Sequence, residues 1–213
     1  MGIREDSKSA RRQAILTAAR ALIQADRAGD FTMAALAETA GVSLATPYNL
    51  LGSKAQILLE IVREDIFEPV AGLAVPADRD LARWVAGLAR TLAGVYYPNR
   101  HFYRRMIVTL VGQESAEGQR AALEFSYRMF ETLLQRLHES GMLPAAAVPA
   151  PILARHLAHS VSGSLQHRLM ERGTEALMAR EIETGLLLLL AGVCSDAQRE
   201  RLQARLRELS VVD

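Results

Sequence analysis

The spacing of the apolar residues limits the possible folds more than any other feature of this chain. Between well-separated prolines and glycines, apolar residues recur at intervals of three and four positions, which is the period of an amphipathic helix. No stretch alternates with the period of two that is typical of strands. The sequence therefore predicts an all-α protein, and its 213 residues suffice for one or two domains with real cores.

Charge and cysteine content narrow the class of protein. With 25 Lys and Arg against 24 Asp and Glu, the chain is no polycation, so an anionic partner must meet a local basic patch. The single cysteine, Cys194, can form neither an internal disulfide nor a zinc site, which fits a reducing compartment. The first ten residues are charged, and the longest apolar run, 184–195, is shorter than the ~20 residues that cross a bilayer. We therefore expect a cytoplasmic protein without a membrane segment.

Capping residues and helix breakers predict where the helices lie. The first helix is expected to follow Ser9, and a later one begins after Ser53 and ends at Pro69. Further helices are expected at about 78–95, 100–111, 118–140 and 151–171, and two more after Thr174 and Ser195. Residues 141–151 have no charge and several prolines, which indicates a linker.

Two short helices joined by a glycine turn stand out near the N-terminus. Thr32 can cap a helix over 33–40, Gly41 permits the left-handed turn, and Ser43 is expected to cap a helix that begins at Leu44. This order predicts a helix-turn-helix. Together with the helix before it, it forms a three-helix domain over residues 1–55, followed by a second helical domain over 56–213.

The block over residues 32–54, TMAALAETAGVSLATPYNLLGSK, resembles the N-terminal domain of the TetR family of bacterial transcriptional regulators. Three positions depart from the family pattern. Leu51 stands where Phe is usual, Ala45 where Gly is common, and Pro47 falls within the first turns of the second helix. Because Pro47 lacks an N–H and restrains Thr46, we expect this helix to begin later, or more loosely, than Ser43 suggests.

The second helix of this motif carries side chains suited to DNA. Ser43 and Thr46 can donate to phosphates or base edges, Leu44 and Ala45 can contact a thymine methyl group, and Asn49 can pair with adenine. The resemblance implies phosphate contacts for Tyr48 and Lys54. Each also has a structural alternative, a half-buried core tyrosine and a solvated lysine. Since this helix has no cation, charge neutralisation falls to residues outside it, and the remaining predicted DNA contacts are Arg11, Arg12 and Thr32.

Eight of the eleven aromatic residues lie between positions 84 and 130. The resemblance implies that helices five to seven enclose an effector cavity, and aromatic side chains suit such a cavity. The alternative is that they only fill the core. A cationic run, Arg100 to Arg105, could hold an anionic effector but more often marks a solvated helix face. The predicted ligand-binding residues are Trp84, Phe102, Tyr103, Met106, Phe125 and Met129.

A stripe of histidines marks one face of the helix over 151–171. No Cys or acidic residue accompanies them, so we expect an interface, with a zinc or nickel sensor as the alternative. Five consecutive leucines, 186–190, give the following helix apolar surface all round. We expect such a helix to be buried on all sides. The resemblance implies that these two helices form a four-helix dimer bundle. The predicted interface comprises Ile152, His156, His159, Gly163, His167, Leu186 and Leu190.

These features together predict a ligand-responsive repressor with no metal and no cofactor. Its expected partners are a palindromic double-stranded DNA operator, a small-molecule effector and a second copy of the chain. An architectural DNA-binding protein without an effector is the alternative. An enzyme is not expected, because there is no Gly-x-Ser-x-Gly, phosphate-binding loop or His-Glu-x-x-His. The serines of 160–164 beside His159 are expected to bond backbone carbonyls.

Overall fold

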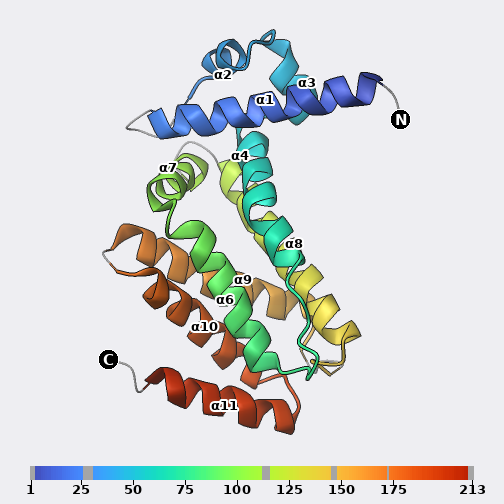
Figure 1. Cartoon of the computed structure of the whole chain (residues 1–213), viewed down its shortest axis with the longest axis vertical. Coiled ribbons are helices and arrows are strands. Elements are labelled where there is room, and N and C mark those ends of the chain that lie inside the picture. Colours follow the sequence, from blue (N-terminus) through green and yellow to red (C-terminus); the bar gives the residue numbers. More distant parts are fainter. Residues whose placement is uncertain (1–2, 26–30, 112–115, 145–147, 172, 211–213) are drawn as a thin grey trace. The chain divides into compact units, whose positions relative to one another are not determined.

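The computed structural model describes residues 3–25, 31–111, 116–144, 148–171 and 173–210. All regular structure within these ranges is helical, which confirms the predicted all-α class (Figure 1). A π-helical turn, η1 (Arg63–Phe67), joins α4 to α5. The helices are α1 (Ile3–Ala25), α2 (Met33–Thr39), α3 (Ala45–Leu51), α4 (Lys54–Val62), α5 (Glu68–Ala71), α6 (Leu81–Tyr96), α7 (Arg100–Val111), α8 (Ala116–Glu139), α9 (Ala150–Met170), α10 (Glu175–Ala191) and α11 (Asp196–Ser210).

The chain forms two compact units that do not follow sequence order. The first unit comprises residues 1–65 and 100–122, and the second comprises 66–99 and 123–213. The expected boundary between residues 55 and 56 lies inside α4. That helix is continuous because Ser53 and Gln56 form a capping box at its start, so it stays with the N-terminal helices.

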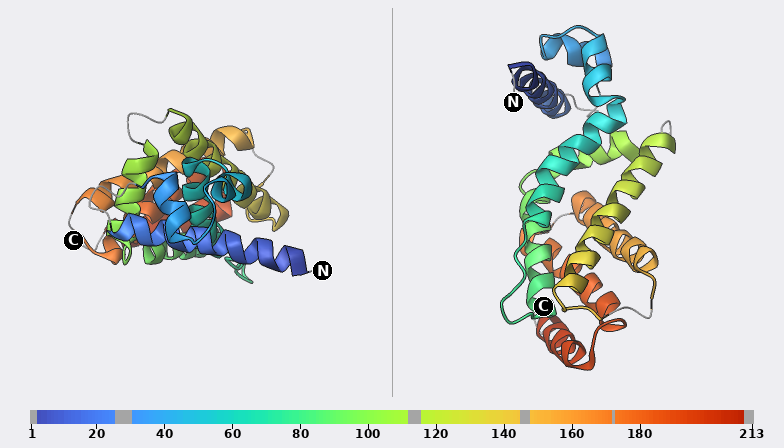
Figure 2. Two further views of the ribbon diagram at one scale, coloured as in Figure 1. Left: turned by 90° about the horizontal axis from the view of Figure 1, so that it is seen from above. Right: turned by 90° about the vertical axis from the view of Figure 1, so that its right-hand side faces the viewer.

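The first unit is built around α1, which packs against α2, α3, α4 and α7. Ile15, Leu16 and Ile23 of α1 are fully buried, as are Leu36 of α2 and Ile57 of α4. Burial of such side chains stabilises a fold by roughly 1.5–3 kcal/mol each. The views in Figure 2 show α1 lying across α2, α3 and α4.

The N-terminal helix begins earlier than its sequence suggested. Ser9 was expected to cap α1, but the helix starts at Ile3 and passes through Ser9. Two acidic residues in the first turn, Glu5 and Asp6, favour this longer helix through its dipole. Arg11 adds hydrogen bonds to the carbonyl and the hydroxyl of Ser7, one turn before it.

The second unit has α10 at its centre, packed against α6, α9 and α11. Trp84 and Leu88 of α6, Leu157 of α9 and Ile182 of α10 are buried in this unit. Gly185 marks the close approach of α9 and α10: a Cβ placed on it would meet the hydroxyl of Ser160, which would have to rotate, and would lie 3.6 Å from the Ser160 Cβ.

The five leucines of 186–190 differ in their burial within the subunit. Leu186, Leu187 and Leu190 are buried, whereas Leu188 is 61% exposed. Leu186 and Leu190, which were predicted at the dimer interface, pack in the core of their own subunit, and their place in that interface stays a prediction. Leu188 is the leucine that α10 leaves on the surface.

Helix α4 does not end at Pro69 as expected. The chain passes through η1 into α5, where Pro69 occupies the first turn. Proline is tolerated there because the first N–H groups of a helix have no partner within it. Elsewhere the predicted caps are confirmed at Thr32, Ser53 and Thr174, whose side chains accept from backbone N–H groups of the first turns.

Candidate DNA-binding site

The second helix of the helix-turn-helix begins at Ala45, later than Ser43 suggested, as expected from Pro47. Leu44 occupies the capping position and makes no side-chain cap. The expectation that Ser43 caps a helix beginning at Leu44 is therefore wrong. The backbone N–H of Thr46 donates to the carbonyl oxygen of Ser43 at 2.9 Å and not to its side chain. Gly41, with φ of 65°, makes the turn that precedes this helix.

The start of α3 presents a continuous uncharged surface. Leu44 is 54% exposed and Tyr48 is 51% exposed, although both are large apolar or aromatic residues. Ser43, Ala45 and Asn49 are also exposed, whereas Pro47 is buried beneath them. An exposed face of small, polar and aromatic groups on a short helix suits insertion into the major groove.

Two hydroxyl groups on this surface bond each other. The Oγ of Ser43 lies 2.8 Å from the Oγ1 of Thr46. Because each hydroxyl has one hydrogen, the pair spends one on this bond and retains one for an outside acceptor. The pair therefore acts as a single donor with a fixed position, which the sequence did not reveal.

Lys54 is neither fully solvated nor buried. Its Nζ lies 4.9 Å from the centroid of the Phe31 ring, a cation–π arrangement. Partial burial lowers the pKa of this lysine from its ordinary value. The solvated-lysine alternative does not describe this environment. Thr32 lies beside Phe31, is exposed, and accepts a hydrogen bond from the backbone N–H of Ala35.

The two predicted arginines of α1 differ in their surroundings. Arg11 is exposed, and its hydrogen bonds to described residues all stay within its own helix, to Ser7. Arg12 forms an ion pair with Glu60 of α4 and lies 3.5 Å from the carbonyl oxygen of Leu50 at the end of α3. Arg12 thus holds α1 to α3 and α4, and much of its charge is already compensated.

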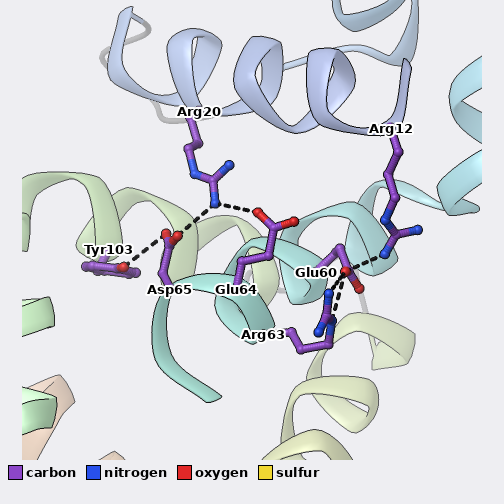
Figure 3. A network of polar contacts seen from close by, with 7 residues as sticks. All are labelled: Arg12, Arg20, Glu60, Arg63, Glu64, Asp65 and Tyr103. Atoms are coloured by element: carbon purple, nitrogen blue, oxygen red, sulfur yellow. Dashed lines mark hydrogen bonds and ion pairs between the residues drawn. The ribbon is translucent and has the colours of Figure 1, made fainter. Parts of the chain in front are cut away.

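Arg12 belongs to a polar network that sequence reasoning missed (Figure 3). Glu60 also accepts from the Nε of Arg63 at 2.8 Å. About two turns further along α1, Arg20 pairs with Glu64 at 3.0 Å and with Asp65 at 2.7 Å. Arg12 and Arg20 thus connect α1 to α4 and η1, and no sequence motif marks these contacts because the partners lie about 45 positions apart.

Helix α7 joins the same network from a distant part of the sequence. The hydroxyl of Tyr103 donates to Asp65 over 3.2 Å, so Asp65 links α7 to Arg20. Arg105 donates to the carbonyls of Ile23 and Gln24 in the last turn of α1. That turn has no basic residue of its own, and Arg105 supplies the charge that a helix C-terminus favours.

The ion pairs of this network shift the pKa values of Glu60 and Arg20. Burial acts to raise the pKa of Glu60, but hydrogen bonds from Arg63 and Arg12 outweigh it, and the pKa lies below its ordinary value. Burial alone would lower the pKa of Arg20, but its bonds with Asp65 and Glu64 raise it instead. Both groups therefore stay charged, and their charges hold the first unit together.

The predicted ligand-binding residues are divided between the two units. In the first unit, Phe102, Tyr103 and Met106 are buried on α7, and the Phe102 and Tyr103 rings meet edge to face at 5.1 Å. In the second unit, Trp84 and Met129 are buried, and the half-buried Phe125 ring lies 6.2 Å from that of Phe67. Their role in lining one cavity stays a prediction.

The remaining predicted interface residues share the exposed face of α9. Ile152, His156, His159, Gly163 and His167 are all exposed, and nothing lies within 4 Å of a Cβ placed on Gly163. His159 Nε2 lies 2.7 Å from the Tyr127 hydroxyl, and His167 lies 3.5 Å from Glu171. Within the described ranges, no three His, Cys, Asp or Glu side chains converge as metal ligands.

Membrane-spanning helices are not found in the described part of the chain, because none of its helices is both long and apolar enough. A helix-turn-helix whose second helix is exposed is typical of DNA-binding proteins. No family model and no curated protein matches the chain.

Solved structures do match it. FadR of Thermus thermophilus, a TetR-family transcriptional repressor in complex with lauroyl-CoA, is 25% identical with a TM-score of 0.66, over 86% of this chain and 95% of that one. A putative TetR-family regulator from Mesorhizobium loti is 20% identical with a TM-score of 0.57, covering 88% and 98%. SmeT, the repressor of the Stenotrophomonas maltophilia efflux pump SmeDEF, is 23% identical with a TM-score of 0.55, covering 88% and 92%. The chain therefore shares its fold with structurally characterised TetR-family transcriptional regulators.

Proposed function

We propose that this protein is a transcriptional repressor that binds a palindromic DNA operator as a homodimer and leaves it when a small molecule binds. The exposed, uncharged face of α3 is the observation that carries the DNA-binding proposal. Leu44, Ala45 and Asn49 meet base edges, while Tyr48 and the Ser43–Thr46 hydroxyl pair meet the sugar-phosphate backbone or bases. Arg11 and Lys54 supply most of the positive charge, because Glu60 compensates Arg12.

The exposed face of α9 is the proposed dimer interface. One seven-residue helix contacts too few base pairs for useful discrimination, so two copies must act together. Ile152 is half exposed, and Leu188 of α10 is the most exposed large apolar residue in the described part of the chain. An isologous pairing through α9 would bury such groups and would give the dimer two α3 helices.

A small-molecule effector is proposed because FadR of Thermus thermophilus, the 25% identical structure, binds lauroyl-CoA. In this chain Phe102 and Met106 are buried on α7. The same helix carries Tyr103, which donates a hydrogen bond to Asp65 of the polar network. A ligand that displaced α7 would disturb the Tyr103–Asp65 and Arg105–α1 contacts, and so the position of the DNA-binding helices. Effector and operator would then oppose each other's binding to the same extent.

Selection of bound duplexes from a random pool tests the proposal directly. We expect an enriched palindrome with two half-sites, and binding that weakens steeply as salt is raised. Operator-bound protein titrated with candidate ligands then tests the response. Enriched half-sites with no ligand that changes operator affinity would favour the architectural alternative. A pool without any enriched sequence would contradict the DNA-binding proposal itself.

Variants of α3 and α4 should separate base recognition from phosphate contact. Tyr48→Phe and Lys54→Ala each remove a group proposed to bind phosphate, so both should weaken binding to every duplex by a similar factor. Asn49→Ala should relax the preference at one position in each half-site, a discrimination of about 1–3 kcal/mol. Binding isotherms on the operator and on single-substituted duplexes measure both effects. Identical profiles for all three variants would contradict this assignment.

A further inference from the structure

A groove of about 410 Å³ lies between α6 and α11 in the second unit. Its volume is in the range of small-molecule sites. The groove is lined by alanines and by charged side chains. The alanines come from both helices and leave room between the charged side chains. The lining is Asp80, Ala82, Arg83, Ala86, Arg90, Arg201, Ala204, Arg205 and Glu208.

Two of the four groove arginines are already committed to carboxylates. Arg83 pairs with Asp78 at 3.0 Å. Arg205 pairs with the buried Glu183 at 2.6 Å and with Glu208 at 2.9 Å. The fourth nearby carboxylate, Asp80, accepts from the backbone N–H of Arg83 at 3.0 Å and caps α6. All four acidic groups around the groove are therefore in use.

Arg90 and Arg201 differ from the other two. With the residues that the structure describes, neither makes an ion pair or a hydrogen bond, although both line the groove. Arg90 lies on the same face of α6 as Arg83, two helical turns or about 10.5 Å along the axis. Arg201 lies one turn before Arg205 on α11. The groove thus has one uncompensated guanidinium on each of its two walls.

The chemistry of these groups indicates the kind of ligand. Guanidinium groups bind carboxylates and phosphates through paired, charge-assisted hydrogen bonds. Two of them on different helices suit two acidic oxygen-bearing groups, or one doubly charged group, better than a single negative charge. The alanine floor of Ala82, Ala86 and Ala204 accepts a short apolar body. Of the two carboxylates that line the groove, Glu208 pairs with Arg205, and Asp80 caps α6.

We propose that the α6–α11 groove is a binding site for a compact dianion, either a dicarboxylate or a phosphate, held between Arg90 and Arg201. The site lies wholly within the second unit and uses none of the residues proposed to bind DNA. It is also distinct from the predicted effector residues. Dianion binding at this groove can therefore be tested independently of operator binding.

Titration calorimetry on the full-length protein, at low ionic strength and pH 7.5, tests the site with succinate and inorganic phosphate as probes. Acetate serves as the singly charged control. We expect saturable binding of at least one dianion, one per chain, and much weaker binding of acetate. Succinate alone would identify a dicarboxylate site and phosphate alone a phosphoryl site, and both would support the shared chemistry.

The double variant Arg90→Gln/Arg201→Gln should weaken dianion binding by about tenfold or more, since a hydrogen bond to a charged group is worth about 1.5–3 kcal/mol. The matched control Arg120→Gln/Arg207→Gln removes two exposed arginines outside the groove and should bind as the wild type does. Circular dichroism should show both variants fully helical, because neither pair makes an ion pair. Absence of saturable dianion binding, or equal weakening in both double variants, would overturn the proposal.

Discussion

Replacing Gly163 with arginine should abolish high-affinity operator binding while leaving the subunit folded. Gly163 lies on the exposed face of α9, and a Cβ added there meets nothing within 4 Å. The substitution therefore fits the isolated subunit and should strengthen the helix, because glycine is about 0.8–1 kcal/mol less favourable than alanine there. In a two-fold dimer paired through this face, however, it would introduce two guanidinium groups into the interface.

The loss should be large because a monomer contacts one half-site only. Specific binding exceeds non-specific binding by roughly 10³-fold or more, and we expect most of that factor to disappear. Sedimentation and operator titration measure the two effects. Gly94→Arg, another exposed glycine within a helix, is the matched control and should stay dimeric. A dimeric Gly163→Arg protein with wild-type operator affinity would refute the α9 interface.

Glu60→Gln should lower the free energy of unfolding by about 1–3 kcal/mol at pH 7. The side chain of Glu60 is only 15% exposed and accepts from both Arg12 and Arg63. Glutamine keeps the shape but removes the negative charge that both guanidinium groups contact. Because Arg12 also lies near the carbonyl of Leu50, the end of α3 should become less firmly held. Urea unfolding gives the stability, and hydrogen exchange at α3 gives the local effect.

The loss of stability in Glu60→Gln should depend on pH. The pKa of Glu60 is lower in the folded protein than its ordinary value of 4.5, so the folded state favours the ionised form. Its stabilising contribution is complete at pH values well above 4.5 and is lost as the pH falls through the lower, folded-state pKa. The difference between wild type and Glu60→Gln should therefore shrink on acidification. Glu200→Gln, at an exposed position of α11, should differ little from wild type at any pH.

Local signals in the sequence predicted most helices, because caps and breakers act over a few residues. Thr32, Ser53 and Thr174 cap helices as expected, and Pro47 shifts the start of α3 as expected. Ser43 was misassigned because α3 begins at Ala45, and the Ser43 hydroxyl bonds the side chain of Thr46 and not a backbone N–H of the first turn.

Contacts between distant segments could not be predicted in this way. The burial of Leu186 and Leu190 depends on which side of α10 meets α6 and α9, and an all-leucine stretch carries no periodicity that distinguishes the sides. Arg12 could be recognised as a cation near the motif. That Glu60 compensates it follows only from the packing of α1 on α4.

The split composition of the first unit has a consequence for protein synthesis. Residues 1–65 leave the ribosome before 100–122, so the N-terminal helices emerge without the side chains of Tyr103 and Arg105 that hold α1. The intervening segment, 66–99, is synthesised before α7 and forms a loop within the first unit. Closing this loop costs conformational entropy, which grows only slowly with loop length. A chimera that joins the DNA-binding helices to another sensor domain would therefore need α7 as well. Without α7, other residues would have to replace the hydrogen bonds that Tyr103 and Arg105 make.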